Sequence, residues 1–261
     1  MALDQSRRKL YVALTGDSAV EVVDVLSGET INRLALFGGD EPVDLALTPD
    51  GRTLLSVNSG SNTVSLIDPG SLIEEARLPV GNGPGSIVVD GSGRRAFVLN
   101  ATSDTVSVVD IPGRQVAATF ATEAEPVKAA FNRDGSRLYI AHRSSPWLSV
   151  IDPVSFSVTG RIYVGTGATA LKVDTRTDRV YIARRSAGRI EIFDAISSLP
   201  SDFIPAEGDV SDMAIDGESN NLFVVLPETG TVKAVRMVTR ETAAGIDVGE
   251  DPARVKLMGE R

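Results

Sequence analysis

The sequence predicts an all-β fold, a β-propeller of six four-stranded blades, on three observations. The first is an internal repeat with a step of 42 residues. The second is the content of each repeat, which consists of four short runs of alternating apolar and polar residues separated by turn signals. The third is the lack of any sustained helical period. Four strands in roughly 40 to 45 residues, repeated along the chain, are typical of propeller blades.

Three sets of equivalent residues define the length and number of the repeats. The first strand of each unit begins at Pro42, Pro84, Pro126, Ala168, Val210 and Pro252. An acid closes the third strand at Asp24, Asp68, Asp110, Asp152 and Asp194, and Arg236 holds the sixth position. A large apolar residue marks the second strand at Tyr11, Leu55, Phe97, Tyr139, Tyr181 and Phe223. Two extra residues in the first repeat lie between the acid marker and the first proline.

Each unit has the same order of elements. In the third, the strand PVKAAF is followed by the turn RDGSR, the strand LYIAH, the strand WLSVID, the turn PVSFS and the strand VTGRIYV. Asp-Gly pairs at 50–51, 90–91 and 134–135 lie between first and second strands, where a tight turn needs residues that tolerate positive φ. One blade cannot bury both of its faces, so the blades must stack on one another.

The last first strand, ARVKLM after Pro252, has no partner strands after it. We expect it to pair with the strand that begins at Lys9 and to complete the first blade, a mixed-termini closure. Residues 1–3 align with the same strand and compete for this place, but they lack the loop that precedes the other first strands. A truncated seven-bladed ring is the alternative. In either case residues 1–261 are expected to form a single propeller domain.

The strand sequences resemble a known repeat family. The runs that carry the resemblance are TVSLID at 63–68, TVSVVD at 105–110, LSVIDP at 148–153, LYVAL at 10–14 and LYIAH at 138–142. They are similar to the unit of the YVTN family of β-propeller repeats over essentially the whole chain. The fifth and sixth repeats depart most, with RIEIFD and TVKAVR in place of the usual run. The resemblance implies a periplasmic or extracellular propeller and leaves its activity open.

Composition excludes several kinds of site. The chain has no cysteine and one histidine, so Cys-bound metals, thiolate nucleophiles and multi-His centres are ruled out, and we expect no metal and no cofactor. A net charge of −9 argues against nucleic acid as a partner. No apolar run approaches the roughly 20 residues of a membrane span. The first four residues, MALD, carry no apolar signal-peptide region, which leaves a trimmed export signal and a cytoplasmic protein as alternatives.

Equivalent positions in the repeats identify candidate binding residues. The position three residues after the large apolar marker ends the second strand, on the face that usually binds ligands in propellers. A polar arc is predicted there from Asn58, Asn100, His142, Arg143, Arg184 and Arg185. Arginine suits bidentate recognition of carboxylates, which indicates an anion site. The alternative is that asparagine caps a turn, that the arginines are solvated and that the histidine is an ordinary loop residue.

Two further sets of residues recur at equivalent repeat positions. The position two residues into each first strand predicts a mixed ring at the channel mouth, made by Asp44, Ser86, Lys128, Asp212 and Arg254. We favour structural pairing within it because its charges alternate in sign. The repeating acids at the ends of third strands are expected to accept N–H groups of the following turns. Trp147, the one tryptophan, is either a binding anchor or a cover for the edge of a blade.

These observations favour a non-enzymatic binding or structural module whose partner is a protein or a small anionic ligand. The alternative is a lactonase-like propeller hydrolase with its site in the central funnel. That reaction needs a compact acid/base or metal constellation, and the first-strand ring offers only two acids, Asp44 and Asp212. No phosphate loop, dinucleotide motif or Gly-x-Ser-x-Gly motif stands in a strand-to-helix context.

Overall fold

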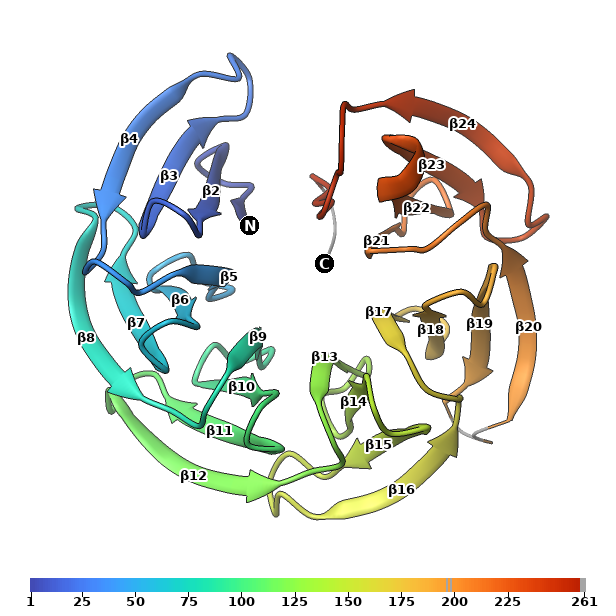
Figure 1. The fold of residues 1–261 in the computed structure, drawn as a ribbon, viewed down its shortest axis with the longest axis horizontal. Helices are drawn as coiled ribbons and strands as arrows, with labels where there is room; N and C mark the ends of the chain where they lie inside the picture. Colours follow the sequence, from blue (N-terminus) through green and yellow to red (C-terminus); the bar gives the residue numbers. More distant parts are fainter. Residues whose placement is uncertain (196, 198, 259–261) are drawn as a thin grey trace. The chain divides into compact units, whose positions relative to one another are not determined.

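The computed structural model describes residues 1–195, 197 and 199–258, which contain 24 β-strands. The strands form six four-stranded sheets, and each sheet pairs its strands in chain order as an antiparallel meander (Figure 1). These sheets are the six blades of a β-propeller, numbered 1 to 6 along the chain. In the described residues the only helical element is a 3-10 turn at Pro227–Thr229. The prediction of an all-β, six-bladed propeller is confirmed.

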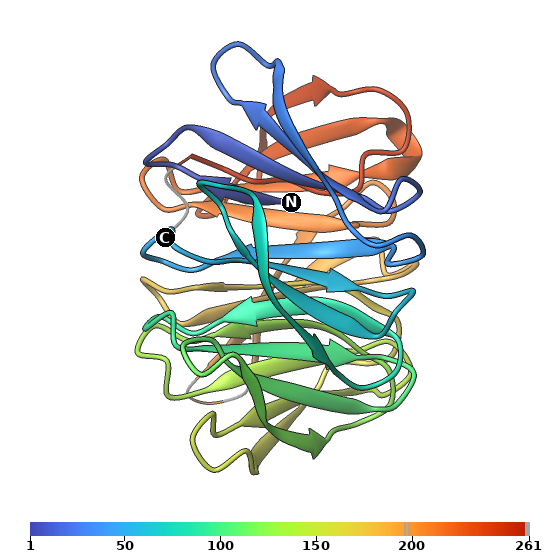
Figure 2. The same ribbon diagram turned by 90° about the vertical axis from the view of Figure 1, so that its left-hand side faces the viewer.

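The chain divides into two compact units, Met1–Pro126 and Val127–Arg261. The first unit contains blades 1 to 3, which lie one above another from blue to green in Figure 2. Blade 1 consists of β1 (Ala2–Asp4), β2 (Lys9–Leu14), β3 (Ala19–Asp24) and β4 (Thr30–Ala35). Blade 2 consists of β5 (Pro42–Leu47), β6 (Leu54–Asn58), β7 (Thr63–Asp68) and β8 (Ile73–Pro79). Blade 3 consists of β9 (Pro84–Val89), β10 (Arg95–Asn100), β11 (Thr105–Asp110) and β12 (Gln115–Ala121).

The second unit contains blades 4 to 6. Blade 4 consists of β13 (Pro126–Phe131), β14 (Leu138–His142), β15 (Trp147–Ile151) and β16 (Val158–Tyr163). Blade 5 consists of β17 (Ala168–Asp174), β18 (Arg179–Arg184), β19 (Arg189–Asp194) and β20 (Pro200–Pro205). Blade 6 consists of β21 (Asp212–Asp216), β22 (Asn221–Leu226), β23 (Thr231–Arg236) and β24 (Thr242–Asp247).

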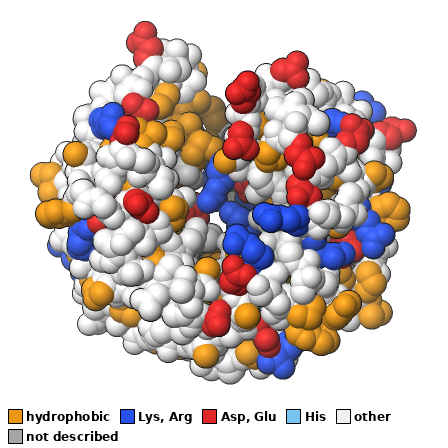
Figure 3. Space-filling view, viewed as in Figure 1, with side chains coloured by type: hydrophobic (Ala, Val, Ile, Leu, Met, Phe, Trp, Pro, Cys, Tyr) orange, Lys and Arg blue, Asp and Glu red, His pale blue; other side chains and the backbone are white. Residues whose placement is uncertain are grey.

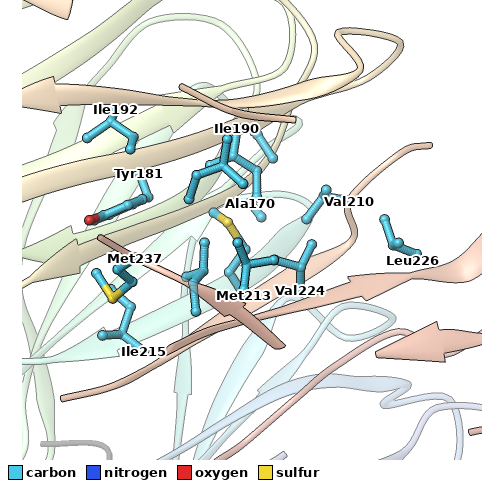
Figure 4. Close-up of a cluster of buried hydrophobic side chains, with 14 residues drawn as sticks. Ala170, Tyr181, Ile190, Ile192, Val210, Met213, Ile215, Val224, Leu226 and Met237 are labelled. Carbon is cyan, nitrogen blue, oxygen red and sulfur yellow. The ribbon is translucent and has the colours of Figure 1, made fainter. Parts of the chain in front are cut away.

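Apolar side chains fill the space between neighbouring blades of a unit. In the second unit, Tyr181 and Ile192 of blade 5 pack against Met213 and Val224 of blade 6 (Figure 4). The second strands of blades 2 and 4, β6 and β14, are buried along their whole length. Full burial of a side chain of this kind contributes roughly 1.5–3 kcal/mol relative to an exposed position. Stacking therefore holds the blades together, as the repeat pattern predicted.

The repeating acids at the ends of third strands cap the turns that follow them. The carboxylate of Asp68 accepts the N–H groups of Gly70 and Ser71 at 2.7 and 2.8 Å. Asp24 and Asp152 each accept the N–H groups of the residues two and three positions further along in their own turns. These acids organise turns, as predicted.

The closure of the first blade differs from the prediction. The innermost strand of blade 1 is β1, in which Ala2 pairs with Tyr11 and Asp4 pairs with Lys9, and residues 252–258 form no strand. The mixed-termini closure is therefore wrong. A short hairpin connects β1 to β2, so closing it costs little chain entropy. The Asp4 carboxylate also fixes this turn, because it accepts the N–H of Arg7 at 2.9 Å.

Candidate functional site

Polar side chains recur at the ends of second strands, where the sequence predicted a ligand-facing arc. Asn58 and Asn100 are both 0% exposed. The amide Nδ2 of Asn58 donates to Oγ1 of Thr63 at 3.1 Å and to Oγ of Ser65 at 2.8 Å. Asn100 makes the equivalent two bonds 42 residues further on, at 3.1 and 3.0 Å. Both amides therefore join the second strand to the third inside one blade and do not face a ligand.

Blade 4 carries a histidine at this position. His142 is 1% exposed, and its Nδ1 donates to the main-chain oxygen of Trp147 at 2.9 Å. The hydroxyl of Ser149, which stands where Ser65 stands in blade 2, is buried and makes no hydrogen bond among the described residues. The imidazole of His142 therefore binds the main chain of the third strand, whereas the asparagines of blades 2 and 3 bind side chains of that strand. His142 belongs to the interior of the hairpin.

Blade 5 carries charged residues at the equivalent positions. Nη2 of Arg184 and Nη2 of Arg189 each donate to the same oxygen, Oε1 of Glu191, at 2.9 Å. The side chains of Arg184 and Glu191 are only 22% and 14% exposed. Nε of Arg184 is buried and makes no hydrogen bond to the residues that the structure describes. Two guanidinium groups around one carboxylate leave this cluster with a net positive charge.

Main-chain hydrogen bonds tie three loops of the second unit together at Gly167. Its N–H donates to the carbonyl oxygen of Arg143 at 2.7 Å, and its own carbonyl accepts the N–H of Arg185 at 2.8 Å. Gly167 has φ of +84°, a conformation that glycine adopts without strain. The backbones of both arginines, which come from different blades, are thereby held against one short loop.

Gly165 brings the same loop against Arg184. The carbonyl of Pro146 accepts the N–H groups of Val164 and Gly165 at 2.9 and 3.1 Å, which fixes the loop on blade 4. A Cβ atom on Gly165 would lie 2.6 Å from Nη1 of Arg184, and φ is +80°. Glycine is needed here both for the backbone conformation and for the close approach of the guanidinium.

The exposed part of this region combines cations with two aromatic rings. Arg143 and Arg185 are exposed, and Nε of Arg185 lies 3.9 Å from a carboxylate oxygen of Asp209. Trp147 stands opposite Tyr163 across β15 and β16, and their ring centroids are 5.4 Å apart in an edge-to-face arrangement. Figure 3 shows Lys and Arg side chains gathered over β17 and β18 and hydrophobic side chains where β15 and β16 adjoin.

The channel-mouth set contains two buried acids with structural bonds. Oδ2 of Asp44 accepts the hydroxyl of Ser86 at 3.0 Å and the N–H of Ile87 at 3.2 Å. Oδ2 of Asp212 accepts the N–H of Val255 at 3.2 Å. These bonds join an innermost strand to the segment one repeat later, and their donors are a hydroxyl and main-chain N–H groups. Pairing between the opposite charges of the set stays a prediction.

The two basic members of that set, Lys128 and Arg254, are partly buried, and each interacts with other groups of the chain. Within the described residues no group of three or more His, Asp or Glu side chains is placed to hold a metal ion. In the same part of the chain, no helix has the length and apolar character that crossing a membrane requires.

Sequence reasoning missed several members of the cluster. Tyr163, Gly165, Arg189 and Glu191 were not singled out. Arg189 lies 42 residues after Trp147, at the start of the third strand. A comparison of all repeat positions, and not only those at the ends of second strands, would have identified it. The approach of Gly165 to Arg184 has no such signal, because it depends on how two loops fold against each other.

The fold and these loops define a β-propeller with a basic, partly aromatic loop cluster in its second unit. The chain is similar in structure to a chain of Kuenenia stuttgartiensis hydrazine synthase, with a TM-score of 0.86 and 17% sequence identity. The match covers 97% of this chain and 87% of the other. At that identity the similarity shows the propeller fold alone. No protein-family model matches the chain, and no curated protein sequence matches it either.

Proposed function

We propose that this chain is a binding module that holds an anionic ligand on the β14–β15 and β18–β19 hairpins of its second unit. The ligand is a small carboxylate or a carboxylate side chain of a protein partner, and it binds Arg143, Arg184 and Arg185. We also propose that the repeats belong to the YVTN family, which the runs TVSLID in β7 and TVSVVD in β11 support.

The observation that carries the proposal is the position of Gly167 between the backbones of Arg143 and Arg185. It holds the backbones of arginines from two blades on one loop, so less backbone entropy is lost when they bind an anion together. Positive groups outnumber negative ones in the cluster. Its charged members are Arg143, Arg184, Arg185, Arg189, Glu191 and Asp209. Guanidinium groups bind carboxylates through paired, charge-assisted hydrogen bonds.

The same geometry favours binding over catalysis. A general base must come within hydrogen-bond reach of the proton that it removes. His142 is buried and bonded to the main chain, and Glu191 is held between two guanidinium groups. Among the described residues nothing favours the lactonase-like alternative.

A citrate titration followed by isothermal calorimetry tests the proposal, with citrate as a probe that carries several carboxylates. Arg185→Ala removes an exposed guanidinium and is expected to weaken citrate binding about tenfold, or ~1.4 kcal/mol. Arg33→Ala is the matched control, because Arg33 is an exposed arginine of the first unit that pairs with Asp17. The proposal fails if millimolar citrate does not bind, or if both variants weaken binding equally.

A further inference from the structure

The aromatic pair of blade 4 departs from the repeat. In blades 2 and 3 the same cross-strand position pairs Thr63 with Pro79 and Thr105 with Ala121. In blade 4 it pairs Trp147 with Tyr163, whose exposed fractions are 37% and 66%. Blades 2 and 3 form this strand pair without aromatic residues, so sheet pairing does not require the two rings. They present apolar surface that a partner can cover.

This aromatic pair lies beside the arginine cluster. Tyr163 precedes Gly165 by two residues, and Gly165 contacts the guanidinium of Arg184. Two residues of chain span at most about 7 Å. The bonds from Val164 and Gly165 to the Pro146 carbonyl hold this short segment on the loop that carries Trp147. Apolar and cationic surface therefore adjoin on one well-fixed segment.

The pattern continues on blade 5. Arg189 occupies the repeat position of Trp147, and its guanidinium carbon lies 5.6 Å from the centre of the Phe203 ring. Phe203 is 49% exposed. The order across the two blades is thus an aromatic pair, then Arg184, then a cation that stacks on a further ring. An interface with aromatic and arginine residues at its centre is typical of protein recognition.

We infer that the ligand of this site is an extended acidic peptide segment of a partner protein. An aromatic or aliphatic side chain of the peptide packs against Trp147 and Tyr163, and a glutamate or aspartate two residues further along binds Arg184 and Arg185. Alternate side chains of an extended chain lie on one side at a spacing of about 7 Å, so two such side chains can reach surfaces that adjoin in this way. The inference rests on the proposed function and names its ligand class.

An acidic sugar is the competing ligand, since it also combines a carboxylate with a surface that stacks on aromatic rings. The interplanar angle of Trp147 and Tyr163 is 78°, so the rings form a corner. A corner encloses a bulky side chain, whereas a sugar ring stacks best on one open, flat face. The geometry therefore favours the peptide.

The probe is the peptide Gly-Phe-Gly-Glu-Gly-Glu-Gly, labelled with fluorescein and followed by anisotropy. Trp147→Ala is expected to weaken peptide binding about tenfold or more, as loss of an interface anchor does, and to leave citrate binding unchanged. Arg185→Ala is expected to weaken both. Leu26→Ala is the matched control, because Leu26 is a 69% exposed apolar residue of the first unit. Peptides with alanine for phenylalanine, or glutamine for both glutamates, are expected to lose binding.

The outcomes separate this inference from the proposed function. If citrate binds through Arg185 while Trp147→Ala and Tyr163→Ala both bind the peptide normally, the peptide inference is overturned and the anion site stands. If neither citrate nor peptide binds, both are overturned. If digalacturonate binds in a Trp147-dependent way and the peptide does not, the ligand is a sugar acid. Thermal melts show which variants are folded, and Tyr163→Ala, which removes the more exposed ring, decides the matter if Trp147→Ala unfolds.

Discussion

The carboxylate of Asp212 accepts the main-chain N–H of Val255 at 3.2 Å, as Asp44 accepts that of Ile87 four repeats earlier at the same distance. Residues 252–258 therefore lie on β21 in the way that β9 lies on β5, although they form no strand. The repeat continues in its hydrogen-bonding register beyond the last sheet. In these two links a buried acid, Asp44 or Asp212, holds the register.

Replacement of Asp44 tests this link. Asp44→Ala leaves the Ser86 hydroxyl and the Ile87 N–H without their acceptor in a buried place, and each such group costs about 1–3 kcal/mol. We expect the free energy of unfolding to fall by about 2–4 kcal/mol, measured by urea denaturation. Asp17→Ala, which removes an exposed acid, is the control and is expected to change it by less than about 0.5 kcal/mol.

The equivalent change at Asp212 is expected to be milder. Asp212→Ala frees the N–H of Val255, which is only partly buried and can bind water instead. A loss of about 1 kcal/mol is expected in the same experiment. If both variants lose the same free energy of unfolding, burial of the donor groups does not determine how much each link contributes.

The sequence predicted the blades well and the arc of polar side chains poorly, for one physical reason. A half-buried strand alternates between apolar and polar residues, so its period is visible. The second strands β6 and β14 are buried along their whole length, which removes the alternation that indicates where a side chain points. Asn58 at the end of β6 was therefore predicted to face a ligand, whereas it is a buried link to β7.

Restoring the repeat in blade 4 tests this account. His142→Asn is expected to place an amide within reach of the Ser149 hydroxyl, which makes no hydrogen bond among the described residues. Stability is expected to stay within about 1 kcal/mol of the wild type or to rise, since a net hydrogen bond contributes about 1 kcal/mol. Asn58→Ala, which removes the same type of link, is expected to cost about 1–3 kcal/mol. A large loss in the histidine variant would show that the imidazole is itself essential to the hairpin.

The turn-capping acids predict how stability depends on pH. Backbone N–H groups of Ser27 and Leu26 lower the pKa of Asp24, those of Ser71 and Gly70 lower the pKa of Asp68, and those of Val154 and Ser155 lower the pKa of Asp152. Because each pKa is lower in the folded chain than in the unfolded one, the unfolded state binds more protons as the pH falls. The contribution is complete above the usual value of about 4 and is lost as the pH falls through the folded pKa.

Acid titration of the melting temperature tests this dependence. A triple variant with asparagine at 24, 68 and 152 keeps an acceptor oxygen in each turn but does not titrate. Its melting temperature is expected to fall less steeply below about pH 4 than that of the wild type. Identical slopes would mean that other carboxyl groups control acid unfolding.

The first blade shows what the repeat pattern does not decide. Two segments, residues 1–3 and 252–258, fit the same place by alignment, and the pattern favoured the second because a loop precedes it. The structure uses β1, whose hairpin is local and whose Asp4 also binds the side chain of Arg7 at 2.7 Å. Alignment measures similarity to a strand, whereas the choice between two strands depends on loop length and on the bonds of a single turn.

The glycine beneath Arg184 gives the last prediction. Gly165→Ala places a Cβ atom 2.6 Å from the Arg184 guanidinium at a φ of +80°, so the arginine must move and the backbone is strained. We expect a loss of about 1–2 kcal/mol in stability and a clear weakening of citrate binding. Gly85→Ala is the matched control, because no atom lies within 4 Å of its added Cβ. If Gly165→Ala loses stability but binds citrate as the wild type does, Arg184 does not contact the anion, and Arg143 and Arg185 alone form the site.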